Sequence, residues 1–494
     1  MSEPRGAGRR DRRDRRDRCE PRDRRKPREP RESREPREAR ERREPREPRE
    51  PREPREPRPI THRAGATTTT TTAALALALA LACLFACGAP RPPDERPPES
   101  LLELVESSPI ETALDHPDLR DAFEVWPEMI GRARRGIDAA QFYVSNAPGS
   151  RLEPVVAALE AAIRRGVAVR LLVERSFEKV YPDTLARLRV AGAAVRGLDF
   201  AATAGGILHA KYFVVDGREA YLGSQNFDWR ALEHIQELGA RVRVPAVVGG
   251  LAAIFAHDWA LAAGESPPGE HPPTAPPPAP APGARSPIAP PPAPRAPTAA
   301  PPPERNAAQI RLVASPERLL PPGIAWDLPR LIELIDRARR RVRVQLLTYR
   351  AGDRTGAPWT ELEEPLRRAA ARGVRVELLL ASWSKRESTI GGLQRLARTA
   401  GIEIRIITIP PWSGGFIPFA RVAHTKLLAV DGSAAWLGTS NWEQDYFYRS
   451  RNVGLVIEDA ALAARVDRFF DTGWSSRYAE RLDPDATYEP PRIQ

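Results

Sequence analysis

The chain contains two copies of one long sequence pattern, and this duplication limits the possible folds more than any other feature. The RARR run at 132–135 precedes the apolar stretch IDAAQFYV, and the RARR run at 337–340 precedes VRVQLLTY in the same way. Further along, RGV at 165–167 opens VAVRLLVE, and RGV at 372–374 opens VRVELLLA. A period of about 200 residues indicates a duplicated domain rather than a solenoid of short repeats.

Each copy alternates short apolar runs with segments that carry apolar residues at helical spacing, such as LEPVVAALEAAIRR and ELEEPLRRAAAR. Strands that alternate with helices predict an α/β fold, with a mixed β-sheet flanked by helices in each copy. We expect each copy to begin with a helix, to alternate three helices with three strands, and to end in further strands and a last helix. The two domains should pack as a pseudo-twofold unit.

Composition suggests where the domains begin and end. Residues 1–60 are an Arg-Glu-Pro repeat with almost nothing apolar to bury, and residues 266–303 hold 18 prolines, which is typical of an extended linker. The predicted organisation is a disordered tail (1–64), an apolar export or anchor segment (65–87), a Pro-rich spacer (88–99), a first domain (100–265), a linker (266–304), a second domain (305–485) and a short tail (486–494).

The charge of the chain is concentrated in its tail. Of the formal net charge of +11, residues 1–60 carry +8 and the remaining residues +3. The folded part is therefore close to neutral, which argues against a protein that coats nucleic acid along its length. The three cysteines are Cys19, Cys83 and Cys87, so neither domain can hold a disulfide or a thiolate metal site.

The apolar run from Ala73 to Cys87 is shorter than the roughly 20 residues of a membrane-spanning helix and fits the apolar core of a secretory signal. Its end, Leu-Phe-Ala-Cys-Gly, resembles the lipobox of bacterial lipoproteins, which implies lipidation of Cys87. The alternative is a plain membrane anchor with its Arg-rich side in the cytoplasm. Either interpretation predicts a membrane-tethered protein of the cell envelope that faces away from the cytoplasm.

Each copy carries the same polar motif towards its end. A histidine is followed after two residues by a lysine and five residues later by an aspartate, and a Gly-[Ser/Thr]-x-Asn motif begins seven residues beyond that. The members are His209, Lys211, Asp216, Ser224 and Asn226 in the first copy, and His424, Lys426, Asp431, Thr439 and Asn441 in the second. A bare His-x-Lys arises by chance about once in a chain of this size, whereas the extended motif is far rarer.

Residue usage supports this motif without any alignment. The chain has 76 Lys and Arg residues, yet only five are lysines, and two of the five lie in the His-x-Lys motifs. Asparagine is equally scarce, and two of the five asparagines close the Gly-[Ser/Thr]-x-Asn motifs. A compact ammonium group and a small amide are what a tight phosphate site requires, since a guanidinium group is wider and planar.

The motifs predict a single pocket built from both copies. In an extended segment, residues two apart face the same side, so each histidine projects together with its lysine. Two imidazoles and two ammonium groups suit a phosphodiester: the lysines, the hydroxyls and the amides would bind its oxygens, and the imidazoles would carry out attack and protonation. Asp216 and Asp431 are expected to support the site by pinning the adjacent turn.

These motifs resemble the signature of the phospholipase D superfamily. Four segments, HAKYFVVDG, YLGSQNFDWRALEHIQELG, IPFARVAHTK and WLGTSNWEQDYF, are more narrowly similar to the animal endolysosomal branch (phospholipases D three and four) and to its poxvirus envelope relatives. The resemblance implies a two-step reaction through a phosphohistidine, without metal or cofactor. It also implies a phospholipid or a single-stranded nucleic acid as substrate.

The resemblance further implies a carboxylate 28 residues after the nucleophilic histidine. Glu237 holds this position after His209, whereas Asn452 holds it after His424. A carboxylate stabilises an imidazolium better than an amide does. We therefore expect Glu237 to contact His209 as the nucleophile, with His424 as the general acid and base and Asn452 in support.

Some alternatives stay open at this point. The site could bind phosphate or phospholipid without turnover, although no histidine or lysine of the motifs is missing. Several aromatic residues could stack a base, hold an acyl chain or simply belong to the core. They are Trp229, Trp383, Trp442, Tyr446 and Phe447.

Overall fold

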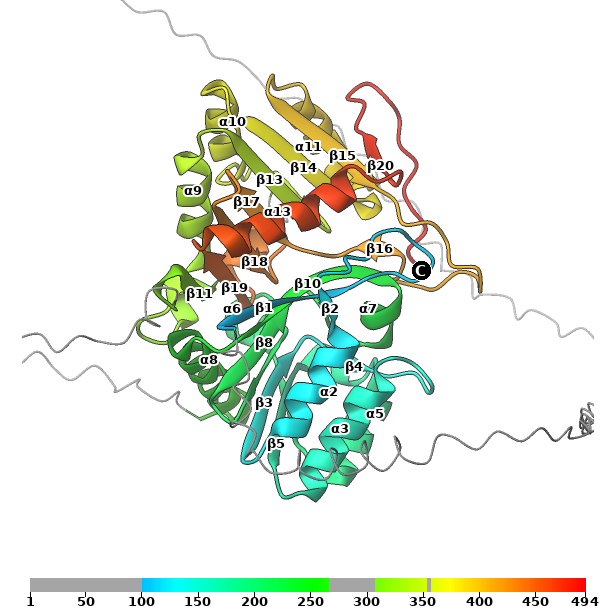
Figure 1. The fold of residues 1–494 in the computed structure, drawn as a ribbon, viewed down its shortest axis with the longest axis vertical. Helices are drawn as coiled ribbons and strands as arrows, with labels where there is room; N and C mark the ends of the chain where they lie inside the picture. The colour runs from blue at the N-terminus through cyan, green and yellow to red at the C-terminus, as the bar shows by residue number, and fades with distance from the viewer. Residues whose placement is uncertain (1–99, 266–306, 353–356) are drawn as a thin grey trace, which may run out of the picture. The chain divides into compact units, whose positions relative to one another are not determined.

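The computed structural model describes residues 100–265, 307–352 and 357–494, all of which fall within one compact unit. The predicted Arg-Glu-Pro tail, the apolar segment with Cys87, the spacer and the whole Pro-rich linker lie outside the described residues. Two sheets organise the described part, one from each copy of the repeat (Figure 1).

The first half contains ten strands and seven helices. Its strands are β1 (Leu102–Ser107), β2 (Arg120–Asp121), β3 (Gly136–Gln141), β4 (Val144–Ser145), β5 (Ala168–Glu174), β6 (Ala194–Leu198), β7 (Tyr212–Val215), β8 (Glu219–Gly223), β9 (Phe227–Asp228) and β10 (Ile235–Val242). Its helices are α2 (Ala122–Arg132), α3 (Glu153–Arg164), α4 (Arg175–Glu178), α5 (Pro182–Ala191), α6 (Phe200–Ala204), α7 (Trp229–Glu233) and α8 (Pro245–Ala263).

The second half repeats this order. Its strands are β11 (Ile310–Ser315), β12 (Ala325–Trp326), β13 (Arg341–Leu346), β14 (Arg375–Ala381), β15 (Ile402–Ile407), β16 (Val422–Ala423), β17 (Leu427–Val430), β18 (Ala434–Gly438), β19 (Asn452–Ile457) and β20 (Ala479–Arg481). Its helices are α9 (Asp327–Arg337), α10 (Glu363–Ala371), α11 (Glu387–Ala397), α12 (Gln444–Tyr448) and α13 (Ala460–Trp474), with short 3-10 turns η1 (Ala307–Gln309), η2 (Glu317–Leu319) and η3 (Ser382–Lys385).

The strand order confirms the duplication and the predicted fold class. The path β2-β1-β10-β8-β7-β3-β5-β6 in the first sheet is matched by β12-β11-β19-β18-β17-β13-β14-β15 in the second. In each sheet the three strands joined through helices are parallel and the remaining neighbours are mostly antiparallel. The opening strands β1 and β11 were not expected from the sequence, because they are fixed by antiparallel pairing with the distant β10 and β19.

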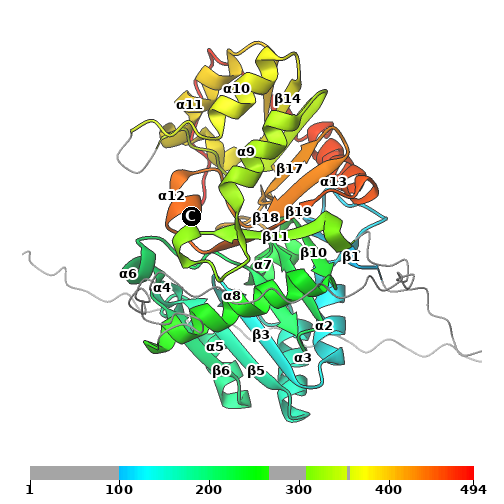
Figure 2. The same cartoon turned by 90° about the vertical axis from the view of Figure 1, so that its left-hand side faces the viewer.

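Successive side chains along a strand point to opposite faces of the sheet, so the apolar residues of one strand contribute to two different cores. In β7, Tyr212 and Val214 face a central core, whereas Phe213 and Val215 face an outer core that includes α2, α3 and α5. Helix α8 covers the central face of the same sheet, and α13 crosses the face of the second sheet (Figures 1 and 2). The central core contains side chains from both halves, so the halves share one apolar interior.

Among the described residues, α8 is the one helix long and apolar enough to cross a membrane. Val247, Leu251, Ile254 and Phe255 on this helix are buried in the central core. Packing between the halves therefore accounts for its apolar sequence.

Candidate active site

The two His-x-Lys segments lie side by side with strands of the opposite half. His209 precedes β7, and its backbone N–H donates to the carbonyl of Arg451 at 2.9 Å. His424 precedes β17, and its backbone N–H donates to the carbonyl of Gln236 at 2.8 Å. The pairing is parallel in both cases, through the Leu208–Arg451 bridge and through the pairing of β16 with β10. These crossed pairings bring the two motifs into one region between the halves.

The imidazoles are bound by partners from the opposite half as well. His209 Nδ1 lies 3.0 Å from Asn452 Oδ1, and His424 Nδ1 lies 2.9 and 3.0 Å from the two oxygens of Glu237. The expected contact between Glu237 and His209 is therefore wrong. Glu237 follows His209 in sequence, but β10 carries it to the His-x-Lys segment of the second half, because the start of β10 pairs with β16.

The tautomer of His209 follows from the orientation of the Asn452 amide. Asn452 Nδ2 donates to the carbonyl of Tyr446 at 2.8 Å, and Asn452 Oδ1 accepts from the Thr439 hydroxyl at 2.8 Å. The amide oxygen therefore faces the imidazole, which must donate through Nδ1–H. This leaves the lone pair on Nε2 of a neutral His209.

Electrostatics separate the two histidines. Burial, and then the nearby Lys211 and Lys426, lower the pKa of His209 well below its usual value. Burial also lowers the pKa of His424 to about 4, but there the Glu237 carboxylate acts in the opposite direction. Of the two imidazoles, only His424 has an anion to stabilise its protonated form.

Both lysines are buried beside the histidines. Lys211 Nζ donates to the carbonyl of His209 at 2.6 Å, and Lys426 Nζ donates to the carbonyl of His424. Burial lowers the pKa of Lys426 to about 7, while the Glu237 carboxylate raises it. The pKa of Lys211 is lowered by burial and by Lys426. A bound phosphodiester anion would favour the charged form of both lysines.

The hydroxyls and the amides of the Gly-[Ser/Thr]-x-Asn motifs have different surroundings. Ser224 Oγ donates to the carbonyl of Leu238 and accepts from its N–H, at 3.2 and 3.1 Å. Thr439 Oγ1 accepts from the N–H of Val453 and donates to Asn452. These contacts favour a positioning role for both hydroxyls over the expected binding of phosphate. Asn226 and Asn441 are buried, and their Oδ1 atoms have no hydrogen-bond partner among the described residues.

The aspartates of the motifs lie away from the imidazoles. Asp216 accepts hydrogen bonds from the backbone N–H groups of residues 134–136 at 2.7 to 3.0 Å. Asp431 accepts from those of residues 339–341 in the same way, at 2.8 to 2.9 Å. Each carboxylate thus fixes the start of β3 or β13 beside the strand that follows its His-x-Lys segment.

Two aromatic rings flank His209. Phe142 lies 5.1 Å from the imidazole between ring centroids, and Tyr446 of α12 lies 4.8 Å away in a T-shaped arrangement. Phe142 was not singled out in the sequence, because it has no aromatic counterpart in the second copy. Of the other aromatic candidates, Trp442 and Phe447 are fully buried in the core of the second half.

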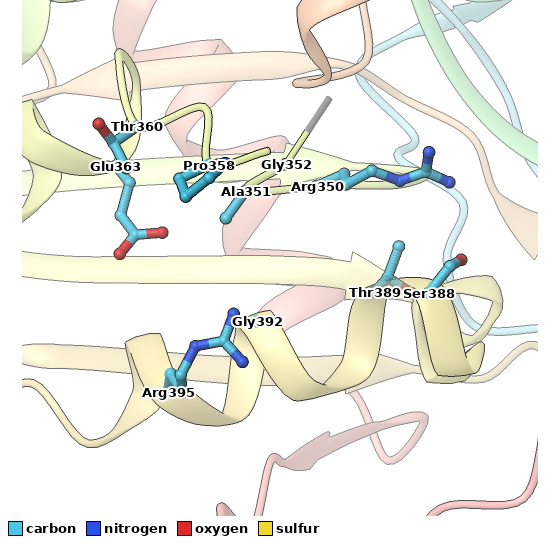
Figure 3. Close-up of a pocket in the computed structure, with 10 residues that line it drawn as sticks. All are labelled: Arg350, Ala351, Gly352, Pro358, Thr360, Glu363, Ser388, Thr389, Gly392 and Arg395. Atoms are coloured by element: carbon cyan, nitrogen blue, oxygen red, sulfur yellow. The ribbon is translucent and has the colours of Figure 1, made fainter. Parts of the chain in front are cut away.

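A cavity of about 550 Å³ lies in the second half between the loop after β13 and helix α11 (Figure 3). Arg350 and Ser388 lie at one end of it, and Arg395 and Glu363 at the other. It is connected to the active-site motif through the backbone, because the N–H of Arg350 donates to the carbonyl of Trp442, which follows Asn441.

Comparison with known proteins agrees with this geometry. Residues 127–259 and 331–474 match the family model described as the cardiolipin synthase, PLD-like domain. The chain is 30% identical over 386 residues to the 5'-3' exonuclease PLD3 of Xenopus laevis, covering 72% of this chain and 76% of the relative. It is 29% identical over 416 residues to the 5'-3' exonuclease PLD4 of Homo sapiens, with coverage of 78% and 79%.

Two further proteins extend the comparison. Phospholipase D Z of Dictyostelium discoideum is 28% identical over 399 residues, covering 76% of this chain and 90% of the relative. The crystal structure of the phosphatidylserine synthase of Haemophilus influenzae Rd KW20 superimposes with a TM-score of 0.50 at 12% identity, covering 73% of this chain and 85% of that one. The latter similarity shows the fold alone.

The fold and the paired His-Lys motifs define a duplicated phosphoric diester hydrolase. The chain belongs to the phospholipase D superfamily, in the branch that contains the PLD3 and PLD4 exonucleases.

Proposed function

We propose that this enzyme cleaves phosphodiester bonds of single-stranded nucleic acid through a phosphohistidine at His209. The observation that carries this proposal is the crossed pairing of the imidazoles, His209 with Asn452 and His424 with Glu237. His209 is neutral and keeps a lone pair on Nε2, as a nucleophile requires. His424 has the Glu237 carboxylate beside it, which stabilises the protonated imidazole that a general acid requires.

His209 and His424 together carry out the attack on phosphorus and the proton transfers of both steps. His209 Nε2 attacks phosphorus, the bond to the leaving oxygen breaks, and His424 Nε2–H gives its proton to that oxygen. In the second step His424 takes a proton from water or from an alcohol, the resulting oxygen attacks phosphorus, and the His209–phosphorus bond breaks. Lys211 and Lys426 stabilise the charge on the phosphoryl oxygens in both steps.

The assignment of the nucleophile thus stays as expected from the sequence, but for a different reason. The carboxylate no longer supports His209, and the neutral state of His209 now favours it as the nucleophile. The competing assignment has His424 as the nucleophile, because Glu237 would also stabilise a phosphorylated imidazolium. Labelling of the phosphorylated histidine distinguishes the two assignments.

The names of the relatives bear on the substrate. Several of them are named 5'-3' exonucleases, and others are named phospholipase D. We therefore treat nucleic acid as the first candidate and phospholipid as the second. A silent phosphate-binding protein is disfavoured, because both histidines and both lysines are present and converge.

A side-by-side assay tests the proposed substrate. The full-length protein is incubated with 5'-labelled single-stranded oligonucleotides and, separately, with phosphatidylcholine vesicles that contain ethanol as an acceptor. We expect stepwise shortening of the oligonucleotide, and its loss in both His209→Ala and His424→Ala. Cleavage of the lipid alone would overturn the choice of substrate, and wild-type activity in either variant would overturn the shared site.

We also propose that the folded part is tethered outside the cytoplasm through Cys87, as the sequence predicts. Cys87 lies outside the described residues. Cys87→Ser should abolish incorporation of radiolabelled palmitate. Unchanged incorporation would contradict lipidation and favour the plain anchor.

A further inference from the structure

A row of aromatic rings leads from His209 to the surface of the first half. Phe142 contacts His209, and the Lys211 ammonium group lies 5.1 Å from the centroid of the same ring. Phe177 follows at 4.4 Å from Phe142, Tyr143 is stacked on Phe177 at 5.4 Å, and Tyr181 is stacked on Tyr143 at 4.9 Å. All four side chains are half-buried. We call these four residues the aromatic wall.

Buried polar groups hold the outer part of the aromatic wall in place. The Tyr143 hydroxyl donates to Asp228 Oδ2 at 2.7 Å, and Arg230 Nη2 lies 2.9 Å from the same carboxylate oxygen. Arg230 also donates to the Tyr181 hydroxyl at 3.3 Å. Asp228 and Arg230 are themselves buried. The rings are therefore fixed before any ligand binds, which reduces the entropy lost on binding.

The aromatic wall has no counterpart in the second half. The strand registers make Leu347 and Thr348 equivalent to Phe142 and Tyr143, and Ser384 equivalent to Phe177. The Thr348 hydroxyl keeps the polar contact, donating to Glu443 at 2.6 Å as Tyr143 does to Asp228. The polar support occurs in both halves, whereas the four rings of the aromatic wall are not repeated at the equivalent positions. The second half has Trp383 of η3 nearby instead, with Arg386 over its ring. The catalytic centre is therefore pseudo-symmetric, whereas the side chains around it are not.

The second half presents positive charge at the corresponding place. Arg350 lies 3.8 Å from the Glu443 carboxylate, and Arg386 lies close enough to Arg350 for the two charges to repel. Arg350 also lines one end of the cavity in Figure 3, and Arg395 lines the other. One side of the site therefore carries aromatic rings. The other side carries the guanidinium groups of Arg350 and Arg395, with the carboxylates of Glu443 and Glu363 nearby.

We propose that the aromatic wall stacks the base of the terminal nucleotide and that the phosphates of the following nucleotides pass over Arg350 towards Arg395. Stacking accepts any base, because every base has a π-face, and guanidinium groups bind backbone phosphates without reading sequence. This inference rests on the proposed function and adds the orientation of the substrate. The leaving oxygen then faces the second half, where His424 can protonate it.

The stacking is tested with two oligonucleotides that differ only in their terminal nucleotide, one with a thymine base and one abasic. Phe177→Leu keeps an apolar side chain but removes the ring. It should raise KM for the thymine substrate by about tenfold, with little change in kcat and no change for the abasic substrate. Phe123→Leu is the control, since Phe123 is a partly buried ring of α2 outside the aromatic wall, and it should leave both KM values unchanged.

The path of the phosphates is tested by substrate length. Arg395→Gln should raise KM for an octanucleotide severalfold but not for a dinucleotide, because a dinucleotide cannot reach the cavity. Arg398→Gln is the matched control at the end of the same helix, where the arginine pairs with Asp485. Circular dichroism confirms that each variant is folded, and Tyr181→Leu offers a second variant of the aromatic wall should Phe177→Leu not fold.

The outcomes separate this inference from the proposed function. If Phe177→Leu raised KM equally for the thymine and abasic substrates, or raised it for neither, the aromatic wall would not be a base site. If Arg395→Gln changed KM equally for the octanucleotide and the dinucleotide, the proposed path of the phosphates would be wrong. If the wild-type enzyme cleaves phosphatidylcholine and no oligonucleotide, the proposed substrate itself is wrong and the inference falls with it.

Discussion

Glu237 from the first half binds His424 from the second half, with both carboxylate oxygens within 3.0 Å of the imidazole Nδ1. Glu237 is fully buried, so this contact is made in a region of low dielectric constant. Its counterpart is the contact between Asn452 and His209. Each half therefore orients the imidazole of the other, and neither half alone has a complete catalytic group.

The contact between Glu237 and His424 predicts how kcat/KM depends on pH. His424 must be protonated to act as the general acid, and the protonated fraction falls as pH rises through its pKa. Glu237→Gln removes the anion that raises this pKa, so the alkaline limb of the kcat/KM profile should move to lower pH. Activity near neutral pH should fall by about 10²-fold.

Asn452→Asp is the converse variant. It places an anion beside His209, raises the pKa of that imidazole, and should shift the acidic limb of the profile to higher pH. The groups that face His209 are Lys211, Lys426 and His424, which all act in the opposite direction. Stopped assays across a pH series measure both variants. Parallel profiles for wild type and Glu237→Gln would contradict the assignment of His424.

The motif aspartates should affect stability and not chemistry. Asp216→Ala leaves three backbone N–H groups without their acceptor and should lower the free energy of unfolding by about 1–3 kcal/mol. Partial burial raises the pKa of Asp216, but the three donors outweigh this and the pKa is lowered.

The carboxylate therefore stabilises the fold above the pKa of an unfolded aspartate, and this contribution is lost as pH falls through the lowered pKa. The difference between wild type and Asp216→Ala in urea denaturation should accordingly shrink in acid. A folded variant with kcat reduced a hundredfold would show instead that the aspartate acts in catalysis.

A buried ion pair supports the segment that binds His209. Arg451 makes two hydrogen bonds of 2.7 Å to Asp258 of α8, and both side chains are fully buried. The carbonyl of Arg451 accepts from the N–H of His209, and Asn452 is the next residue. Arg451→Met should cost about 3–5 kcal/mol and also lower kcat of the folded protein.

Arg343→Met is the matched control for this variant. Arg343 is also buried and is paired with Glu377 and Asp471, but it contacts no residue of the active site. It should lower the melting temperature without changing kcat per folded molecule. An Arg451→Met protein that is destabilised but has wild-type kcat would show that the ion pair is purely structural.

In the proposed mechanism, Lys211 and Lys426 supply the positive charge that a metal ion supplies in other phosphodiesterases. Among residues 100–265, 307–352 and 357–494, no cluster of His, Cys, Asp and Glu side chains could hold a metal ion. Because the proposed mechanism uses Lys211 and Lys426 as its positive charges, activity should survive dialysis against EDTA and should not rise when Mg²⁺ or Zn²⁺ is added. A strict requirement for either ion would contradict the proposed mechanism.

The sequence was sufficient to predict that the two His-x-Lys motifs come together, because His209, Lys211 and their repeats are close neighbours along the chain and occur twice. It could not show which of the two imidazoles Glu237 contacts and which one Asn452 contacts. That choice depends on the pairing of β10 with β16, between residues more than a hundred positions apart. The sequence did not predict the aromatic wall for a related reason, since Phe142 and Phe177 come from separate segments and have no repeat partners.

The most direct test of the shared site is a burst experiment with a nucleoside phosphodiester that carries p-nitrophenol as its leaving group. This leaving group needs no general acid, so His424→Ala should release one equivalent of p-nitrophenolate and then stop with the phosphoryl group on His209. His209→Ala should show no burst, and the modified peptide in His424→Ala should contain His209. Continuous turnover in His424→Ala, or a burst in His209→Ala, would contradict a single centre in which both imidazoles serve one phosphorus atom.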